Sequence, residues 1–103
     1  MKKNLQDLVD NDKLIFAARK IMLLTNFDRT EIINLILQNQ AMNVTQIHTQ
    51  LNFRQPDTSA HLQLMHRYGI VNRERRGSAI YYSINEKAIE EMAKISEELN
   101  KIS

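Results

Sequence analysis

The stretch from residue 55 to residue 84, QPDTSAHLQLMHRYGIVNRERRGSAIYYSI, decides the fold because its apolar period changes midway. Pro56 has a fixed φ and no amide donor, which suits the first turn of a helix. That helix is expected to run to Tyr68, and Gly69 stands where a left-handed helix end is expected. Beyond Gly69 the apolar period changes from about 3.6 residues to about 2, which predicts that strands follow the helix.

Two strands are predicted after this helix, over residues 70–74 and 79–84. Residues 76–78 lie between them, so a short antiparallel hairpin is expected. Alternation along the second strand places three apolar side chains on one face, namely Ile80, Tyr82 and Ile84. The neighbouring tyrosines Tyr81 and Tyr82 therefore point to opposite faces, one inward and one outward.

The two helices before this stretch are expected to begin at capping boxes. In such a box one side chain caps the helix, and a residue three positions later bonds back to the cap's own amide. We expect these helices over about 29–38 and about 44–51. The cap and its partner are Asp28 with Glu31 in the first helix and Asn43 with Gln46 in the second.

Apolar stripes at both ends of the chain indicate a surface for a second copy. Residues 5–24 have apolar side chains at helical spacing, which predicts one long helix or two short ones. Asn85 can cap a final helix with a heptad-spaced stripe, which packs either on its own domain or on a partner's copy, and we favour the partner. The predicted dimer-interface residues are Leu5, Leu8, Phe16, Met92, Ile95, Leu99 and Ile102.

The order of these elements predicts a winged helix-turn-helix. With 103 residues, two glycines and one proline, we expect a single domain over residues 1–103 with short connections. The predicted fold class is mainly α with a small antiparallel β-hairpin, about five helices and two strands in all.

Several function classes are excluded or disfavoured by composition. The chain has no cysteine, which excludes disulfides, zinc–thiolate sites and a cysteine nucleophile. A glycine-rich phosphate loop and a histidine–carboxylate pair at useful spacing are both missing, so we expect no enzyme and no cofactor. No apolar run approaches the length of a membrane span, and polar residues follow the first lysines, so a cytoplasmic protein is expected.

Positive charge is concentrated in one part of the chain, although the net charge of the whole is only +2. Residues 54–82 hold five arginines against two acids, a net charge of +3. Residues 83–103 hold three lysines against five acids, a net charge of −2. Clustered arginines suit phosphate binding, although a solvated surface loop has the same composition.

Double-stranded DNA is therefore the expected partner. In a helix-turn-helix the second helix enters the major groove by its N-terminal residues, which here are polar. The hairpin arginines are expected at phosphates or the minor groove, with Arg75 and Arg76 foremost. His61 contacts DNA or forms a local hydrogen bond on the helix. The predicted DNA-binding residues are Arg54, Gln55, Thr58, Ser59, His61, Gln63, Arg73, Arg75 and Arg76.

These segments resemble one known family. Residues 58–65 followed by 68–71 look like the recognition helix and exit of ArsR/SmtB-type transcriptional regulators. Residues 73–77 followed by 80–84 are similar to the wing of that family. The resemblance covers roughly residues 12–102 and implies a homodimeric repressor that binds specific DNA.

The chain also departs from that family. Residues 26–29 stand where the family usually has Asp-Pro-Thr-Arg, and only Arg29 matches. Metal-sensing relatives carry cysteines where this chain has Asn43 and Thr45, and the last helix has no histidine. Carboxylates alone make a poor transition-metal site. We therefore expect a regulator that does not sense metal through either family site, with an effector that the resemblance does not identify.

One alternative function belongs to a different class. A winged helix can serve as a protein-interaction module, with the basic hairpin docked on an acidic partner, because fold does not determine function. The polar, small side chains at Thr58 and Ser59 argue against it, since an interaction helix more often presents aromatic or aliphatic side chains.

Overall fold

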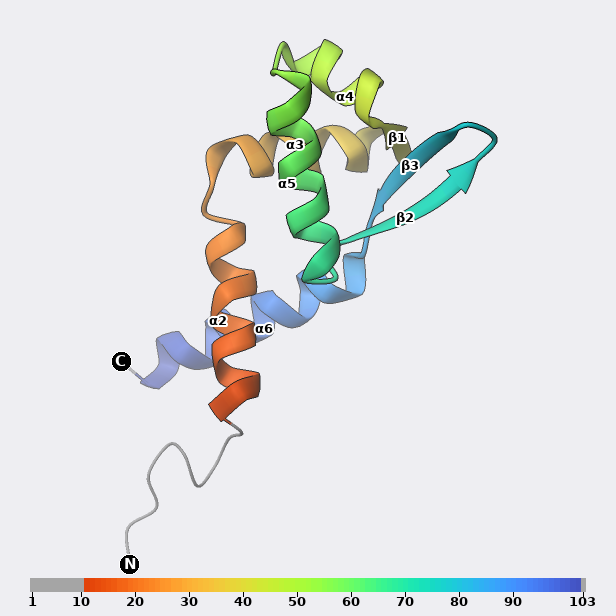
Figure 1. Cartoon of the computed structure of the whole chain (residues 1–103). Helices are drawn as coiled ribbons and strands as arrows, with labels where there is room; N and C mark the ends of the chain where they lie inside the picture. Colours follow the sequence, from red (N-terminus) through yellow and green to blue (C-terminus); the bar gives the residue numbers. More distant parts are fainter. Residues whose placement is uncertain (1–10, 103) are drawn as a thin grey trace, which may run out of the picture.

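A computed structural model describes residues 11–102, which form five helices and a three-stranded sheet (Figure 1). The elements in chain order are α2 (Asn11–Leu23), α3 (Phe27–Asn39), β1 (Ala41–Asn43), α4 (Val44–Leu51), α5 (Gln55–Arg67), β2 (Val71–Arg76), β3 (Ala79–Ile84) and α6 (Glu86–Ile102). The predicted fold class, a mainly α winged helix-turn-helix, is confirmed. Leu5 and Leu8 lie outside the described residues.

The sheet contains one strand more than the sequence indicated. Its order is β1-β3-β2, and both pairs are antiparallel. The additional strand β1 pairs Met42 with Tyr82 of β3. It has only three residues, which is too short for an apolar period to be recognised. Through β1, the segment that enters the helix-turn-helix is joined to the base of the wing, which is formed by β2 and β3.

The core lies between α3, α4 and α5 and the covered face of the sheet. Each of these elements contributes side chains that are completely or almost completely buried. Burial of apolar side chains is the main contribution that stabilises the folded state. The largest of them are Ile32, Ile36, Ile47, Leu62, Met65, Ile70 and Val71, with Met42 and Tyr82 beside them. The helix-turn-helix of α4 and α5 is therefore packed on the same core as the wing.

Helix capping confirms one of the two predicted boxes and corrects the other. The Asn43 side chain accepts the amide of Gln46 at 2.9 Å, and the Gln46 side chain accepts the amide of Asn43 at 3.0 Å. The cap of α3 is Asn26, not Asp28, since Asn26 Oδ1 accepts the amide of Arg29 at 3.1 Å. The Asp28 prediction was wrong because α3 starts earlier, so Asp28 lies inside the first turn.

Asn85 connects the exit of α5 to the start of α6. Gly69 ends the α5 segment with φ +74°, in the left-handed region where glycine is favoured, as predicted. The Asn85 side-chain amide donates to the Gly69 carbonyl at 3.0 Å. Its Oδ1 accepts the amide of Ala88 at 3.2 Å, which confirms the predicted cap of the last helix. One side chain thus holds the exit of α5 against the first turn of α6.

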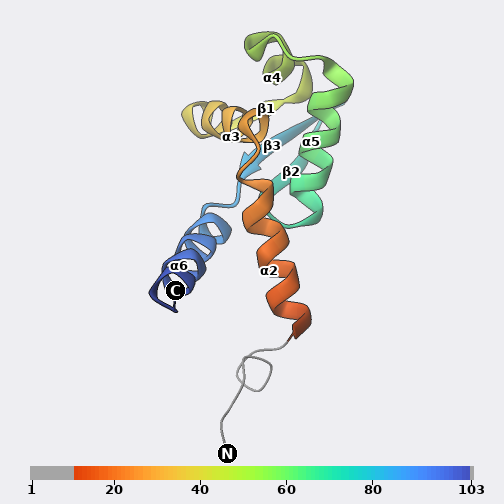
Figure 2. The ribbon, with the colours of Figure 1, turned by 90° about the vertical axis from the view of Figure 1, so that its left-hand side faces the viewer.

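The first and last described helices, α2 and α6, extend away from the rest of the domain in the same general direction (Figure 2). α2 and α6 contact each other along part of their length. In the part of the chain that the structure describes, neither these nor the other helices have the length and apolarity that crossing a membrane requires.

Candidate nucleic-acid interface

The exposed side of α5 carries polar side chains from its first two turns. Gln55 and Gln63 are exposed, and Ser59 is half-buried between them. The Gln55 side-chain amide donates to Ser59 Oγ at 3.2 Å. Arg54 precedes the helix, is exposed, and makes no side-chain capping bond. These four side chains lie where the recognition helix of a helix-turn-helix meets base edges and phosphates.

Thr58 does not belong to this surface, so its prediction as a DNA contact was wrong. Its side chain is fully buried, with 0% exposure. The hydroxyl donates to the Arg54 carbonyl at 3.0 Å, which satisfies the polar atom inside the core. Thr58 faces the same core as Leu62 and Met65, one turn and two turns further along α5. Its role is packing of the recognition helix.

His61 bonds to a residue 32 positions earlier in the chain. Arg29 Nε, in the first turn of α3, donates to His61 Nδ1 at 3.1 Å. Burial and the Arg29 guanidinium together lower the pKa of His61, while Asp28 and Asp57 oppose the shift. Of the two roles considered for His61, the structure provides a hydrogen bond within the protein, although to α3 and not to its own helix. His61 therefore helps to hold α5 in position.

The wing arginines divide between the two faces of the hairpin. Arg73 pairs with Tyr82 and Arg75 with Ile80, so both lie on the face that continues the core, because directly opposed residues share a face. Arg76 pairs with Ala79 and lies on the opposite face. Arg73 and Arg75 are exposed and form no salt bridge within the described residues.

Arg76 is held by neighbours on its own face. Its guanidinium lies 3.4 Å from a Glu74 carboxylate oxygen and 4.8 Å from the centre of the Tyr81 ring. Tyr81 faces outward with Arg76, whereas Tyr82 is only 5% exposed, so the expected division of the two tyrosines is confirmed. Arg76 is consequently less free than Arg75 to reach a phosphate.

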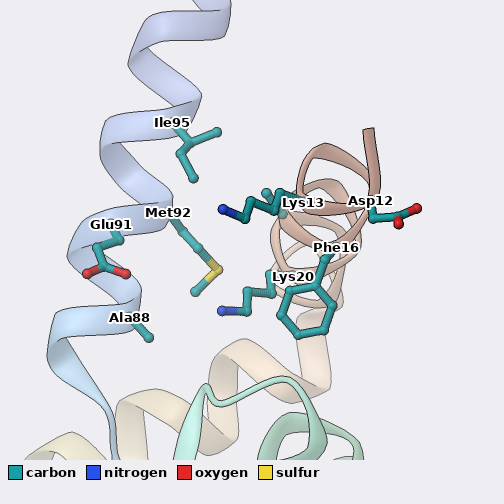
Figure 3. A pocket seen from close by; sticks show the side chains of 9 residues that line it. Asp12, Lys13, Phe16, Lys20, Ala88, Glu91, Met92 and Ile95 are labelled. Carbon is teal, nitrogen blue, oxygen red and sulfur yellow. The ribbon is translucent and has the colours of Figure 1, made fainter. Parts of the chain in front are cut away.

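An open groove runs between α2 and α6, on the surface predicted for a second copy (Figure 3). Its volume is about 600 Å³. Phe16 is 45% exposed at its edge, and Lys13 and Lys20 extend from α2 toward α6. The groove is lined by Asp12, Lys13, Phe16, Ala17, Lys20, Ala88, Glu91, Met92 and Ile95.

The C-terminal stripe is partly used inside the chain itself. Met92 is only 3% exposed, so it leaves little area for another chain, and its place in a dimer interface stays a prediction. It packs in the core of its own protomer because α2 already covers that part of α6. Ile95 remains half-buried at the groove, and Leu99 and Ile102 lie further along α6. An interface on α6 would therefore begin near Ile95.

Residues 11–102 do not form a recognisable metal site. Nowhere in this part do three or more histidine, cysteine, aspartate or glutamate side chains gather as a metal site. Asn43 and Thr45, at the start of α4, stand where metal-sensing relatives were expected to carry cysteines. The Asn43 side chain caps α4 by accepting the Gln46 amide.

Comparison with known proteins identifies relatives of the same architecture. No family model matches the chain. It is 40% identical over 67 residues to the transcriptional repressor PagR of Bacillus anthracis, covering 65% of this chain and 67% of that protein. The crystal structure of PagR aligns with a TM-score of 0.67 at 32% identity, over 84% of this chain and 99% of the other.

Two further relatives agree with this result. The HTH-type transcriptional regulator MJ1325 of Methanocaldococcus jannaschii is 32% identical over 71 residues, 69% of this chain and 80% of that protein. The homodimeric winged helix-turn-helix domain Mb0332 of Mycobacterium bovis, a possible ArsR-family regulator, aligns with a TM-score of 0.72 at 26% identity, over 98% of this chain and 92% of the other.

The fold and these relatives define a class, the winged helix-turn-helix transcriptional regulators, which are not enzymes. Within that class the chain belongs to the family of PagR and is similar to Mb0332, a possible ArsR-family regulator, as its recognition helix and wing indicated. It has no cysteine, in keeping with the expectation that the cysteine ligands of metal-sensing relatives are missing.

Proposed function

We propose that this protein is a homodimeric repressor that binds a specific DNA sequence. The observation that carries the proposal is the exposure of polar side chains on α5 together with the exposure of Arg73 and Arg75 on the wing. α5 would lie in the major groove, and the wing beside the adjacent phosphates. PagR is a repressor and Mb0332 is a homodimer, which supports both parts of the proposal. A repressor of bacterial type works on chromosomal DNA, so we place it in the cytoplasm.

Two groups of side chains are proposed to have different tasks. Gln55, Ser59 and Gln63 would contact base edges, since amide side chains pair well with adenine. The arginines at positions 54, 73 and 75 would neutralise phosphates and provide affinity without sequence preference. Arg76 would contribute less because Glu74 already compensates its charge.

The test is fluorescence anisotropy with DNA from upstream of the protein's own gene and with a scrambled duplex, at two salt concentrations. Arg75→Ala should weaken binding to both duplexes by the same factor and reduce the salt slope by about 1. Gln63→Ala should reduce the preference for the native duplex by about fivefold or more. Arg76→Ala is the matched control for Arg75→Ala and should lose less affinity.

Two outcomes would contradict the proposal. Equal losses on both duplexes for the Gln63 and Arg75 variants would remove the division between recognition and phosphate contacts. Absence of binding to either duplex at low salt would favour the protein-interaction module instead.

A further inference from the structure

A second hollow, away from the α2/α6 groove, lies on the flank of the recognition helix. It is formed by the end of α2, the start of α3 and the second half of α5, and has a volume of about 330 Å³. This size is at the lower end of the range for small-molecule sites in proteins. Its lining residues are Arg19, Met22, Leu23, Arg29, Leu64 and Tyr68.

The hollow combines two guanidinium groups with an apolar floor. None of the six lining residues is acidic. Arg19 is exposed and forms no salt bridge within residues 11–102, and Arg29 uses only Nε, for His61. The terminal nitrogens of both arginines are therefore available as donors in the described part of the chain. A guanidinium is the side chain best suited to hold a carboxylate or phosphate by two parallel hydrogen bonds.

The apolar side chains that line the hollow favour a ligand with an apolar part. Met22 is 68% exposed although it lies at an apolar position of α2, and Leu64 and Tyr68 are only half-buried. Covering this apolar area would be favourable, and it is not covered by any other described element. A methionine also adapts its shape to different ligands.

Residues that line the hollow either belong to α5 or contact it directly. Arg29, which lines it, bonds to His61 on α5 at 3.1 Å. Leu64 and Tyr68 belong to α5 and its C-cap, and the Tyr68 ring lies 5.1 Å from the Phe16 ring of α2. A ligand that changes the Arg29 bond or the spacing of these residues would bias α5 relative to α2 and α3, and so change DNA affinity.

We propose that this hollow is an effector site for a small organic anion, with the charged group on Arg19 and Arg29 and an apolar body on Met22, Leu64 and Tyr68. The ligand class is a carboxylate or phosphate monoester attached to a ring or short hydrocarbon. Regulation of DNA binding by this ligand rests on the proposed repressor function, whereas binding of the anion does not.

The experiment uses 1-naphthoate as the probe and neutral 1-naphthamide as its control, with the full chain and no DNA. Naphthoate should shift backbone amide NMR signals of Arg19, Met22 and Leu64, and naphthamide should bind at least about tenfold more weakly. Arg19→Gln should weaken naphthoate binding by about tenfold. Lys87→Gln, which removes the same charge from an exposed position on α6, should leave it unchanged.

A second arm adds operator DNA. Saturating naphthoate should change the DNA dissociation constant of the wild type by at least about threefold and leave that of Arg19→Gln unchanged. Equal binding of naphthoate and naphthamide, or equal binding to wild type and Arg19→Gln, would overturn the site. Naphthoate bound in the hollow without any effect on DNA binding would overturn its regulatory role.

The arginines of the hollow could instead hold the DNA backbone. In that case Arg19→Gln would weaken DNA binding while the wild type bound no naphthoate, and the proposal would be overturned. A wild type that binds naphthoate but no DNA would contradict the repressor function and leave the anion site supported. Met22→Gln, an exposed substitution, is a second variant that should weaken naphthoate binding without removing a charge.

Discussion

His61 shows how a single side chain of the recognition helix is adapted to its place. A histidine on the exposed part of such a helix would be free to approach DNA, but here Nδ1 accepts a hydrogen bond from Arg29. The accepting nitrogen must be unprotonated, so the bond requires the neutral imidazole in the tautomer that carries its proton on Nε2. The contact is therefore sensitive to protonation.

We predict that acidification destabilises the protein through His61. Its pKa is lowered in the folded state by burial and by Arg29, so the unfolded state binds the proton more tightly. The stabilising contribution is complete above the unfolded pKa of about 6.5 and is lost as the pH falls from there through the lowered folded value. His61→Asn keeps an acceptor but removes the titration.

Urea unfolding at about pH 7.5 and about pH 5.5 measures this effect. The wild type should lose more free energy of unfolding between the two pH values than His61→Asn. His66→Asn serves as the control for removing an exposed histidine from the same helix. Parallel losses in the wild type and His61→Asn would contradict the assignment.

At the scale of elements, local signals in the sequence were reliable where all the partners lie within one turn. The Asn43 and Gln46 box was predicted correctly because both of its bonds join residues three positions apart. The cap of α3 is harder to predict because Asn26 and Asp28 are both good capping residues, and the structure shows that Asn26 makes the capping bond. Helix ends are thus less predictable than helices.

We predict that the Asn43 cap is important for the helix-turn-helix. Asn43→Ala removes the side-chain acceptor of the Gln46 amide, leaves the backbone amide that bonds to the Gln46 side chain, and should lower the free energy of unfolding by about 1 kcal/mol. Gln50→Ala, an exposed change on the same helix, should alter it by less than about 0.5 kcal/mol. Urea unfolding of the two variants provides the measurement, and indistinguishable midpoints would contradict the prediction.

Side chains with distant partners could not be assigned from sequence. Thr58 is one of the polar residues at the start of the recognition helix, yet its hydroxyl donates to the carbonyl four residues earlier and its side chain packs in the core. The Arg29 to His61 bond joins α3 to α5 across 32 positions, and no local pattern signals it. The division of Arg73 and Arg75 from Arg76 follows only from the strand register.

For the whole molecule, the groove between α2 and α6 is the surface on which we predict that two copies meet. Phe16 and Ile95 leave apolar area at its edge. We predict that Ile95→Asp shifts the protein from dimer to monomer, because a charge would be buried in the apolar interface. Operator binding should fall with it, since two recognition helices joined in one dimer bind two half-sites together.

Sedimentation velocity at micromolar concentration measures this change. Ala93→Asp introduces the same charge at an exposed position on α6 away from the groove, and should remain dimeric. Circular dichroism confirms that both variants are folded. A dimer that persists in Ile95→Asp would place the interface elsewhere.

The junction at Asn85 has a geometric consequence for a dimer built on α6. The Asn85 side chain donates to the Gly69 carbonyl, after α5, and accepts the Ala88 amide, in the first turn of α6. Because successive residues of a helix are rotated by about 100°, the register of α6 at this junction determines which of its faces meets the other copy. In such a dimer, the Asn85 amide group would help to set the angle and separation of the two DNA-binding units. The permitted distance between operator half-sites would then depend on a residue outside the side chains proposed to contact bases.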